Sequence, residues 1–407
     1  MLDECKIVVK DDPEIQLNRE QHDKQTGKER SGEPQGEPLT ESQGKCPAEP
    51  QEERLTDAYG RTIDYLRISL TDRCNLRCRY CMPEEGILAF RHDEILTLEE
   101  VYRVAEVLTG MGIRRIRLTG GEPLVRKNMQ SLVQRLGQLP SRPELSLTTN
   151  GVLLEEYLEE FHAAGLRSIN ISLDTKDPET YRKLTGVDAL DRVERAIEKA
   201  VAMGMRVKLN CVPIRGINEE ELADFVGMAR ELPLDVRFIE LMPIGCASEF
   251  RGIARDEILS GLEKVYGPAE PVLHDGISNP GKGGISDPGK DGVHSKDEGK
   301  NASAEGPAEY IHFRGFLGRV GFISPMSHAF CENCNRVRLT ADGRLKLCLY
   351  YPDGPALLPM LREGCTDEEL RNVIRQGLLL KPERHSFGRV DRPARSPEDR
   401  NMNQIGG

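Results

Sequence analysis

Six of the eleven cysteines in this 407-residue chain form two groups of three, and their spacing is the first sign of chemistry. The groups are Cys74, Cys78 and Cys81, and Cys331, Cys334 and Cys348. Three thiolates on one short loop can hold three irons of a [4Fe-4S] cluster and leave the fourth iron open to an external ligand. We expect a cytoplasmic protein, where thiols stay reduced, so the grouping indicates metal ligation rather than disulfides.

A structural zinc site is the alternative for each group, because zinc takes four protein ligands, usually Cys or His. His92 is the only nearby fourth ligand for the first group, and there the spacing favours a cluster. For the second group, His328 lies just before the first cysteine, so a Cys₃His zinc site stays open. Arg336 and Arg338, two apart on an expected strand, suit phosphate oxygens. A solvated strand face would also explain them.

The chain between the two groups alternates short β-type runs with helix-sized gaps. Strands are expected at residues 66–70, 113–118, 144–149, 168–173, 205–212 and 235–241. Thr97 and Glu100 form a capping-box pattern at the start of the first helix, and Gly112, Gly165 and Gly204 follow three of the helices. Six β-α units predict a parallel sheet that is either doubly wound or curled into a barrel.

The alternation of polar and apolar residues along these strands separates the two folds. Strands of a doubly wound sheet are buried on both faces and form continuous apolar runs. Here Arg67 and Ser69 share one face while Leu66 and Ile68 share the other, and the later strands repeat the pattern. A half-exposed antiparallel sheet would not need helix-sized connections. The sequence therefore predicts an α/β barrel, apolar toward its helices and polar around a ligand.

Composition divides the rest of the chain. Residues 1–55 are strongly acidic and contain no aromatic residue, which predicts a disordered extension. Residues 271–309 contain two near-duplicate Gly- and Pro-rich runs, which predict a flexible insertion between the barrel at 56–270 and a C-terminal region at 310–407.

The net charge of -11, without a dense basic run, argues against nucleic-acid binding. An apolar stretch long enough for a membrane span or signal peptide is not expected.

The first cysteine group, with Tyr80 before its last cysteine, resembles the signature of the radical S-adenosylmethionine superfamily. Thr119-Gly-Gly-Glu-Pro123 resembles the glycine-rich segment that meets the methionine amino group of the cofactor, where glycine permits a close approach. The resemblance implies reductive cleavage of S-adenosyl-L-methionine to a 5′-deoxyadenosyl radical. The matching cofactor-binding positions are Tyr80, Gly121, Ser172 and Met242.

A wider set of residues resembles the GTP 3′,8-cyclases, the molybdenum cofactor biosynthesis protein A family. The similarity covers about residues 55–267 and 311–407, including 330–339, Cys348, 238–242 and the terminal 402–407. It implies a lyase with two [4Fe-4S] clusters and a partial (β/α)₆ TIM-like barrel closed by a C-terminal β-rich layer. The implied reaction converts GTP to 3′,8-cyclo-7,8-dihydro-GTP, the first step of molybdenum cofactor biosynthesis, through hydrogen abstraction from ribose C3′.

The same resemblance assigns the substrate residues and partners. The second cluster would bind the guanine edge, and the matching GTP positions are Arg67, Arg117, Thr148, Lys208, Arg237, Arg336 and Arg338. Arg338, Gly406 and Gly407 are the expected catalytic residues, because the family threads a Gly-Gly end into the cavity. An electron donor protein and a cyclic pyranopterin synthase that receives the product are the implied partners, and a homodimer stays open. The rivals are a radical peptide-modifying enzyme with an auxiliary cluster and a zinc-stabilised interaction protein.

Overall fold

The structure, a computed structural model, describes residues 54–83, 85–272, 306–352, 354–387, 398 and 400–406. The predicted disordered extension lies almost entirely outside these residues. Most of the predicted insertion and Gly407 also lie outside them.

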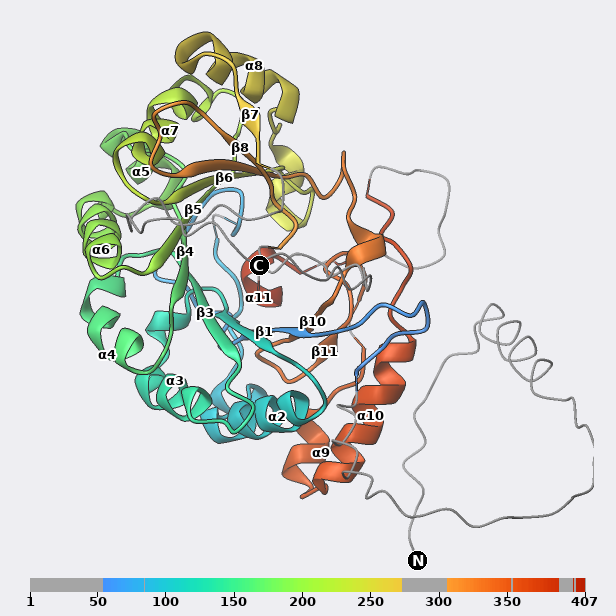
Figure 1. Ribbon diagram of the computed structural model, residues 1–407. Coiled ribbons are helices and arrows are strands. Elements are labelled where there is room, and N and C mark those ends of the chain that lie inside the picture. The colour runs from blue at the N-terminus through green and yellow to red at the C-terminus, as the bar shows by residue number, and fades with distance from the viewer. Residues whose placement is uncertain are drawn as a thin grey trace, which may run out of the picture. The chain divides into compact units, whose positions relative to one another are not determined.

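A single sheet organises the described residues, with the strand order β11-β10-β1-β2-β3-β4-β5-β6-β9-β8-β7. Its central strands are β1 (Tyr65–Ser69), β2 (Arg115–Thr119), β3 (Glu144–Thr149), β4 (Ser168–Ser172), β5 (Arg206–Cys211) and β6 (Asp235–Ile239). Each pairs in parallel with the next, and all six match predicted strands to within two residues. The strands form an open arc with helices on its outside, so the predicted partial barrel is confirmed (Figure 1).

Helices connect these strands and cover their apolar face. They are α2 (Leu98–Gly110), α3 (Met129–Gly137), α4 (Leu158–Ala163), α5 (Pro178–Thr185), α6 (Leu190–Ala202), α7 (Leu222–Glu231) and α8 (Arg255–Tyr266). The predicted capping box opens α2, since the Thr97 hydroxyl accepts from the Glu100 amide while the Glu100 carboxylate accepts from the Thr97 amide. The apolar strand residues Leu66, Ile68 and Leu118 are fully buried beneath the helices. The polar residues of the same strands therefore face the inside of the arc.

The C-terminal strands extend both edges of this sheet. They are β7 (Glu270–Pro271), β8 (Glu309–His312), β9 (Arg319–Ile323), β10 (Arg336–Leu339) and β11 (Leu345–Lys346). β9 runs parallel to β6, whereas β10 runs parallel to β1 at the opposite edge. The β-rich region predicted to close the barrel thus continues the sheet itself, which places residues far apart in the sequence next to β1.

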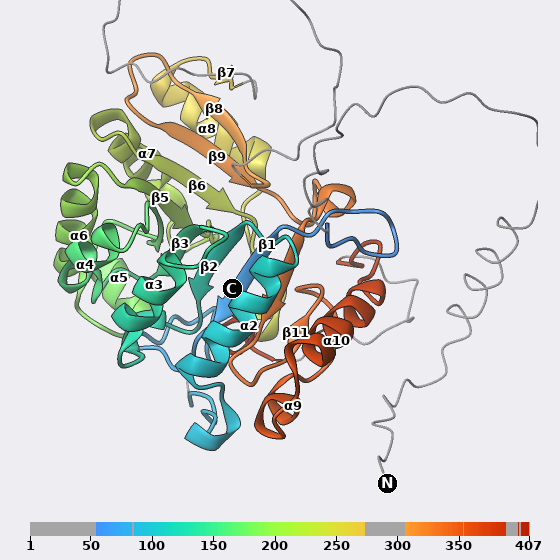
Figure 2. The same cartoon turned by 60° about the horizontal axis from the view of Figure 1, so that its bottom comes forward.

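Three further helices belong to this C-terminal region: α9 (Leu358–Arg362), α10 (Asp367–Leu379) and α11 (Met402–Ile405). α9 and α10 lie beside β10 and β11 (Figure 2). α11 lies within the arc of strands, near its centre (Figure 1). Within the described part of the chain, no helix is long and apolar enough to cross a membrane.

Candidate active site

The first cysteine group lies on the loop that follows β1, held by neighbouring elements. The amides of Arg77 and Arg79 donate to the carbonyls of Thr185 and Leu184 at the end of α5. The Cys74 sulfur accepts from the side chain of Asn150, 3.7 Å away at the end of β3. The loop is therefore anchored to two barrel elements before any metal binds.

The three thiols of this loop share one environment. Burial raises the pKa of Cys74 to about 11, that of Cys81 to about 12 and that of Cys78 well above the usual range. Mutual repulsion adds to the shift at Cys78, because the sulfurs of Cys74 and Cys81 lie close enough to interact with it. In the described part of the chain these thiols are not grouped closely enough to hold a single metal ion, but three free thiols on one loop match in number and kind the donor set of a [4Fe-4S] cluster with one open iron, which binds its three thiolates through three separate irons.

The glycine-rich segment after β2 packs directly on this loop. The Gly121 amide donates to the Thr71 carbonyl over 2.7 Å, and a Cβ atom on Gly121 would lie 2.5 Å from the Arg73 carbonyl oxygen. Only glycine allows this approach. The fully buried Glu122 carboxyl accepts from the Thr149 hydroxyl at 2.8 Å, and burial raises its pKa to about 7. The glycines thus allow close packing of this segment on the cysteine loop, and their approach to the cofactor stays a prediction.

Of the predicted cofactor positions Tyr80, Ser172 and Met242, Tyr80 contacts a second buried carboxyl. The Tyr80 hydroxyl donates to Asp174 Oδ2 over 2.8 Å. Burial raises the pKa of Asp174 to about 6. Ser172, at the end of β4, is exposed, and Met242 is half-buried in the loop after β6. Asp174 was not among the predicted site residues, although its position two residues after Ser172 is the strand-alternation signal that could have found it.

Strand register brings the predicted GTP residues together inside the arc. Arg67 on β1 stands opposite both Arg117 on β2 and Arg338 on β10, while Arg336 stands opposite Tyr65. Across the sheet, Thr148 and Lys208 flank Asn170, and Arg237 pairs with Asn210. The pairing between β1 and β10 unites arginines that lie about 270 positions apart in the chain.

The arginine side chains that face the inside of the arc include buried hydrogen-bond donors without a partner in the described chain, and the space around them is called the arginine cavity below. The Nε atoms of four arginines are buried without a hydrogen-bond partner in the described part of the chain: Arg67, Arg237, Arg336 and Arg338. Burial, reinforced by neighbouring guanidinium groups, lowers the pKa of Arg338 to about 9 and those of Arg117 and Arg336 to about 10. A buried cluster of cations with unsatisfied donors fits a polyanionic ligand.

Tyr65 is a member of this cavity that the sequence analysis missed. The centre of its ring lies 5.1 to 5.9 Å from the guanidinium carbons of four arginines: Arg67, Arg115, Arg117 and Arg336. Burial alone would raise its pKa, but the surrounding arginines outweigh burial and lower the pKa to about 8. Its position two residues before Arg67 placed it on the same strand face.

The second cysteine group lies at the edge of the cavity, beside β10. Cys331 opens the short helix η6 (Cys331–Asn333), Cys334 precedes Arg336 by two residues, and Cys348 follows β11. Burial raises the pKa of Cys331, and the charges of Cys348 and Cys334 add to this increase. Burial would also raise the pKa of Cys334, yet Lys381 and Arg336 outweigh it and lower the pKa.

Neither histidine considered for zinc joins its cysteine group. His328 is exposed, and its Nδ1 atom contacts the Ser327 hydroxyl at 3.2 Å. His92 is exposed and lines an outer hollow near the start of α2. Each group thus consists of three free thiols without one of these histidines, which in number and kind is the donor set expected of a cluster with an open iron.

The C-terminal segment enters the cavity. The Asn403 side chain donates to the Asp72 carbonyl over 3.0 Å, and its backbone amide reaches the Cys81 sulfur. Gly406 is buried with φ +73°, and a Cβ atom there would lie 2.7 Å from Cβ of Ser69 on β1. Gly406 thus occupies a position where any other residue would be strained and crowded.

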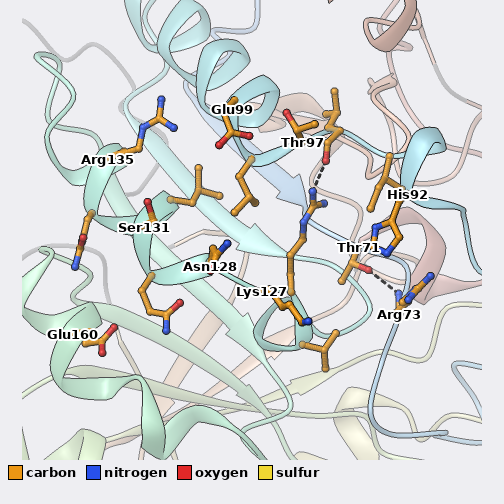
Figure 3. Close-up of a pocket in the computed structure, with 18 residues that line it drawn as sticks. Thr71, Arg73, His92, Thr97, Glu99, Lys127, Asn128, Ser131, Arg135 and Glu160 are labelled. Carbon is orange, nitrogen blue, oxygen red and sulfur yellow. Dashed lines mark hydrogen bonds between the residues drawn. The ribbon is translucent and has the colours of Figure 1, made fainter. Parts of the chain in front are cut away.

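A separate hollow of about 990 Å³ lies outside the arginine cavity, near the first turns of α2 and α3. Figure 3 shows Arg73, His92, Lys127 and Arg135 around it, together with Glu99 and Glu160. Its lining residues do not include the predicted cofactor or GTP positions in the described chain. Arg73 connects this hollow to the cysteine loop, because it directly precedes Cys74.

Comparisons with known proteins agree with this geometry. Residues 68–229 match the Radical SAM superfamily, and residues 290–387 match Molybdenum Cofactor Synthesis C. The barrel, the cysteine loop and these matches define a radical S-adenosylmethionine enzyme. The GTP 3′,8-cyclase of Clostridium perfringens (strain 13) is 40% identical over 353 residues, covering 87% of this chain and 100% of that protein. The GTP 3′,8-cyclase of Moorella thermoacetica is 44% identical, with the same coverage.

This chain belongs to the GTP 3′,8-cyclase family. Its cofactors are S-adenosyl-L-methionine and [4Fe-4S] clusters, which the two groups of three thiols fit. Among solved structures, SuiB of Streptococcus suis bound to S-adenosylmethionine shows only a remote likeness, with 18% identity and a TM-score of 0.42 over 50% of this chain and 46% of that one.

Proposed function

We propose that the arginine cavity between the two cysteine groups holds GTP during its conversion to 3′,8-cyclo-7,8-dihydro-GTP. The observation that carries this proposal is the set of buried guanidinium groups whose Nε atoms have no partner in the described chain. Phosphate oxygens would satisfy these donors and compensate the repulsion among the arginines. A peptide substrate would neither satisfy these donors nor compensate this repulsion, which argues against the peptide-modifying alternative.

At one end of the cavity, Cys74, Cys78 and Cys81 would hold the first cluster. Tyr80, Gly121, Ser172 and Met242 would contact S-adenosylmethionine. When bound, the cluster would supply the electron for reductive cleavage of this cofactor, and the cofactor would supply the radical chemistry at C3′ of the GTP ribose. The protein's part is to bind, orient and exclude water. Asp174 would fix the Tyr80 ring through its 2.8 Å hydrogen bond.

At the other end, Cys331, Cys334 and Cys348 would hold the second cluster, which would bind guanine. The remaining GTP contacts would come from the strands that face the cavity: Arg67, Arg117, Thr148, Lys208, Arg237, Arg336 and Arg338. Holding both ends of the nucleotide would keep C3′ and C8 close together. Such a fixed geometry favours the intramolecular step.

Gly406 and Gly407 would act between the two ends. Gly406 contacts Ser69 on β1 and lies near Thr119 on β2, each two residues beyond the arginine pair Arg67 and Arg117. In this position, backbone amides without side chains would approach the substrate or cofactor closely. Arg338, the most strongly shifted of the cavity arginines, would stabilise charge on the reacting nucleotide.

The direct test is anaerobic incubation of reconstituted protein with S-adenosylmethionine, dithionite and GTP, followed by product analysis. We expect about eight irons per chain, as two [4Fe-4S] clusters require. Cyclised GTP and one 5′-deoxyadenosine per product would support the proposal. A fully loaded enzyme that cleaves the cofactor but leaves GTP unchanged would contradict it.

We also propose that an electron donor protein docks over the hollow of Figure 3. The support is its place beside the first cysteine loop and the basic residues around it, in a chain whose net charge is -11. An acidic carrier would be attracted to this side. Arg73→Glu with Lys127→Glu should slow turnover with a protein reductant but not with dithionite, whereas exposed Arg182→Glu should slow neither. Equal rates with the protein reductant would place its docking site elsewhere.

Three statements remain predictions from the resemblance. They are transfer of the product to a cyclic pyranopterin synthase, assembly as a homodimer, and residence in the cytoplasm.

A further inference from the structure

Lys381 is a buried lysine next to the second cysteine group. It follows the C-terminal end of α10 and is only 3% exposed. Its Nζ atom donates to the Cys334 sulfur at 3.5 Å, the Arg336 carbonyl at 2.9 Å and the Leu347 carbonyl at 2.6 Å. An ammonium group has three donors, and these three acceptors use all of them.

The three acceptors belong to two chain segments, and the backbone pairing between β10 and β11 does not extend to the cysteines of these segments. β10 and β11 pair only at Arg338 with Lys346 and at Leu339 with Leu345. Cys334 lies before β10 and Cys348 lies after β11, so both cysteines fall beyond this short ladder. Lys381 bonds to the chain on each side, through Arg336 next to Cys334 and through Leu347 next to Cys348. Its ammonium group therefore ties together the two segments that carry these ligands.

The charge of Lys381 also needs an explanation. Burial of a cation is costly unless it is hydrogen-bonded and compensated by an anion. Two of its three partners are neutral carbonyls, so only the Cys334 sulfur can provide the negative charge. A thiolate that ligates iron is such an anion. The position of the ammonium group is thus matched to a metal-bound Cys334.

We propose that Lys381 is a positioning residue of the second cluster, which aligns Cys334 with Cys348 and raises the reduction potential of the cluster through its bond to the Cys334 sulfur. The inference rests on the proposed function, in which these cysteines hold a cluster. Hydrogen bonds and positive charge at a cluster sulfur favour the reduced state, because reduction adds negative charge. In the sequence, Lys381 stands directly before Pro382 and has no local pattern that indicates this role.

The test compares Lys381→Met and Lys381→Arg with the unaltered protein, all full-length and reconstituted. Met keeps most of the side-chain length but donates no hydrogen bond. Iron content and the midpoint potential of each cluster are measured by redox titration followed by electron paramagnetic resonance. In Lys381→Met, we expect the reduction equilibrium of the second cluster to fall about tenfold, or about 59 mV for one electron. The first cluster should be unchanged, and Lys381→Arg should recover most of the shift.

Lys346→Met is the matched control, because Lys346 is also fully buried in this region but bonds to Glu398 and the Tyr351 carbonyl. This substitution should leave the reduction potential of the second cluster unchanged. Loss of the second cluster from folded Lys381→Met, with recovery in Lys381→Arg, would support the positioning role. If Lys381→Met does not fold, Lys381→Gln, which keeps a neutral donor, is measured instead. The same shift in the midpoint potential of the second cluster is then expected.

The outcomes separate the inference from the function on which it rests. A wild-type protein that binds only four irons would contradict the second cluster itself. A wild-type protein with both clusters, alongside a Lys381→Met variant with the same iron content and the same second potential, would overturn only the role of Lys381. A shift of equal size in Lys346→Met would also overturn it, because the effect would then not require a bond to Cys334.

Discussion

The two cysteine groups have the same number of thiols but opposite electrostatic surroundings. Near the first group lie the buried carboxyl groups of Glu122 and Asp174, and burial raises the pKa of each of its thiols. Near the second group lie Lys381, Arg336 and Arg338, which lower the pKa of Cys334. A sulfonium cofactor is cationic, whereas GTP is polyanionic. The surroundings, more than the ligands, therefore indicate which group meets the cofactor and which meets the substrate.

The largest effect expected from breaking this division is that of Cys78→Ala. Loss of the first cluster should abolish reductive cleavage of S-adenosylmethionine, because the sulfonium needs an electron source bound directly to it. The measurement is the yield of 5′-deoxyadenosine under dithionite. Cys365→Ala, which removes a half-buried thiol outside both groups, should retain normal yield. Normal yield from folded Cys78→Ala would refute the assignment of the first group.

Cys334→Ala should separate the two halves of the reaction. Cleavage of the cofactor should survive, because the first group is intact, whereas GTP binding and cyclisation should fail. The comparison requires iron content, 5′-deoxyadenosine and cyclised product from one preparation. Wild-type cyclisation in a variant that lacks the second cluster would give that group a structural role only.

Deleting Gly406 and Gly407, or changing both to Ala, should leave both clusters and GTP affinity largely intact while cyclisation is lost. At Gly406, a Cβ atom would lie 2.7 Å from Ser69, and its φ of +73° disfavours residues with side chains. The readouts are iron content, GTP affinity and product. Near-normal product from the truncated enzyme would show that the end of the chain takes no part in the reaction.

Arg336→Ala and Arg338→Ala should each weaken GTP binding by about 1.5 to 3 kcal/mol, the range for charge-assisted hydrogen bonds in a desolvated site. Guanosine, which lacks phosphates, should lose much less affinity. Isothermal titration with both ligands measures the difference, and Arg371→Ala on α10, which removes a half-buried arginine outside the predicted GTP positions, is the control. Equal losses for GTP and guanosine would place these arginines away from the triphosphate.

The smallest expected effect is a pH dependence of folding stability that arises from Glu398, which lies before α11. Burial would raise the pKa of Glu398, but its bonds to Arg400 and Lys346 outweigh burial and lower the pKa from 4.5 to about 2. The ionised carboxylate therefore stabilises the folded state above about pH 4.5, and this contribution is lost as the pH falls toward 2. Urea unfolding between these pH values should show a shallower pH slope in Glu398→Gln. An unchanged slope would exclude Glu398 as the titrating group.

Periodicity and motif spacing were enough to predict most of the barrel. All six parallel strands were found because alternation and glycine-ended helices are local patterns that a parallel sheet requires. The inward positions of Arg67, Arg117, Thr148 and Lys208 follow from the same alternation. Tyr65 was missed because the predicted strand began at residue 66, whereas β1 begins at Tyr65.

The sequence by itself determined the thiol groups, the strand faces and the family, because each depends on residue type and spacing over short stretches. Only the tertiary structure decided which distant residues meet. The parallel pairing of β10 with β1 brings Arg338 beside Arg67, and the end of α10 brings Lys381 against Cys334. Such contacts depend on sheet order and on how separate elements pack, and a lysine at the end of a helix has no local pattern that names its partner.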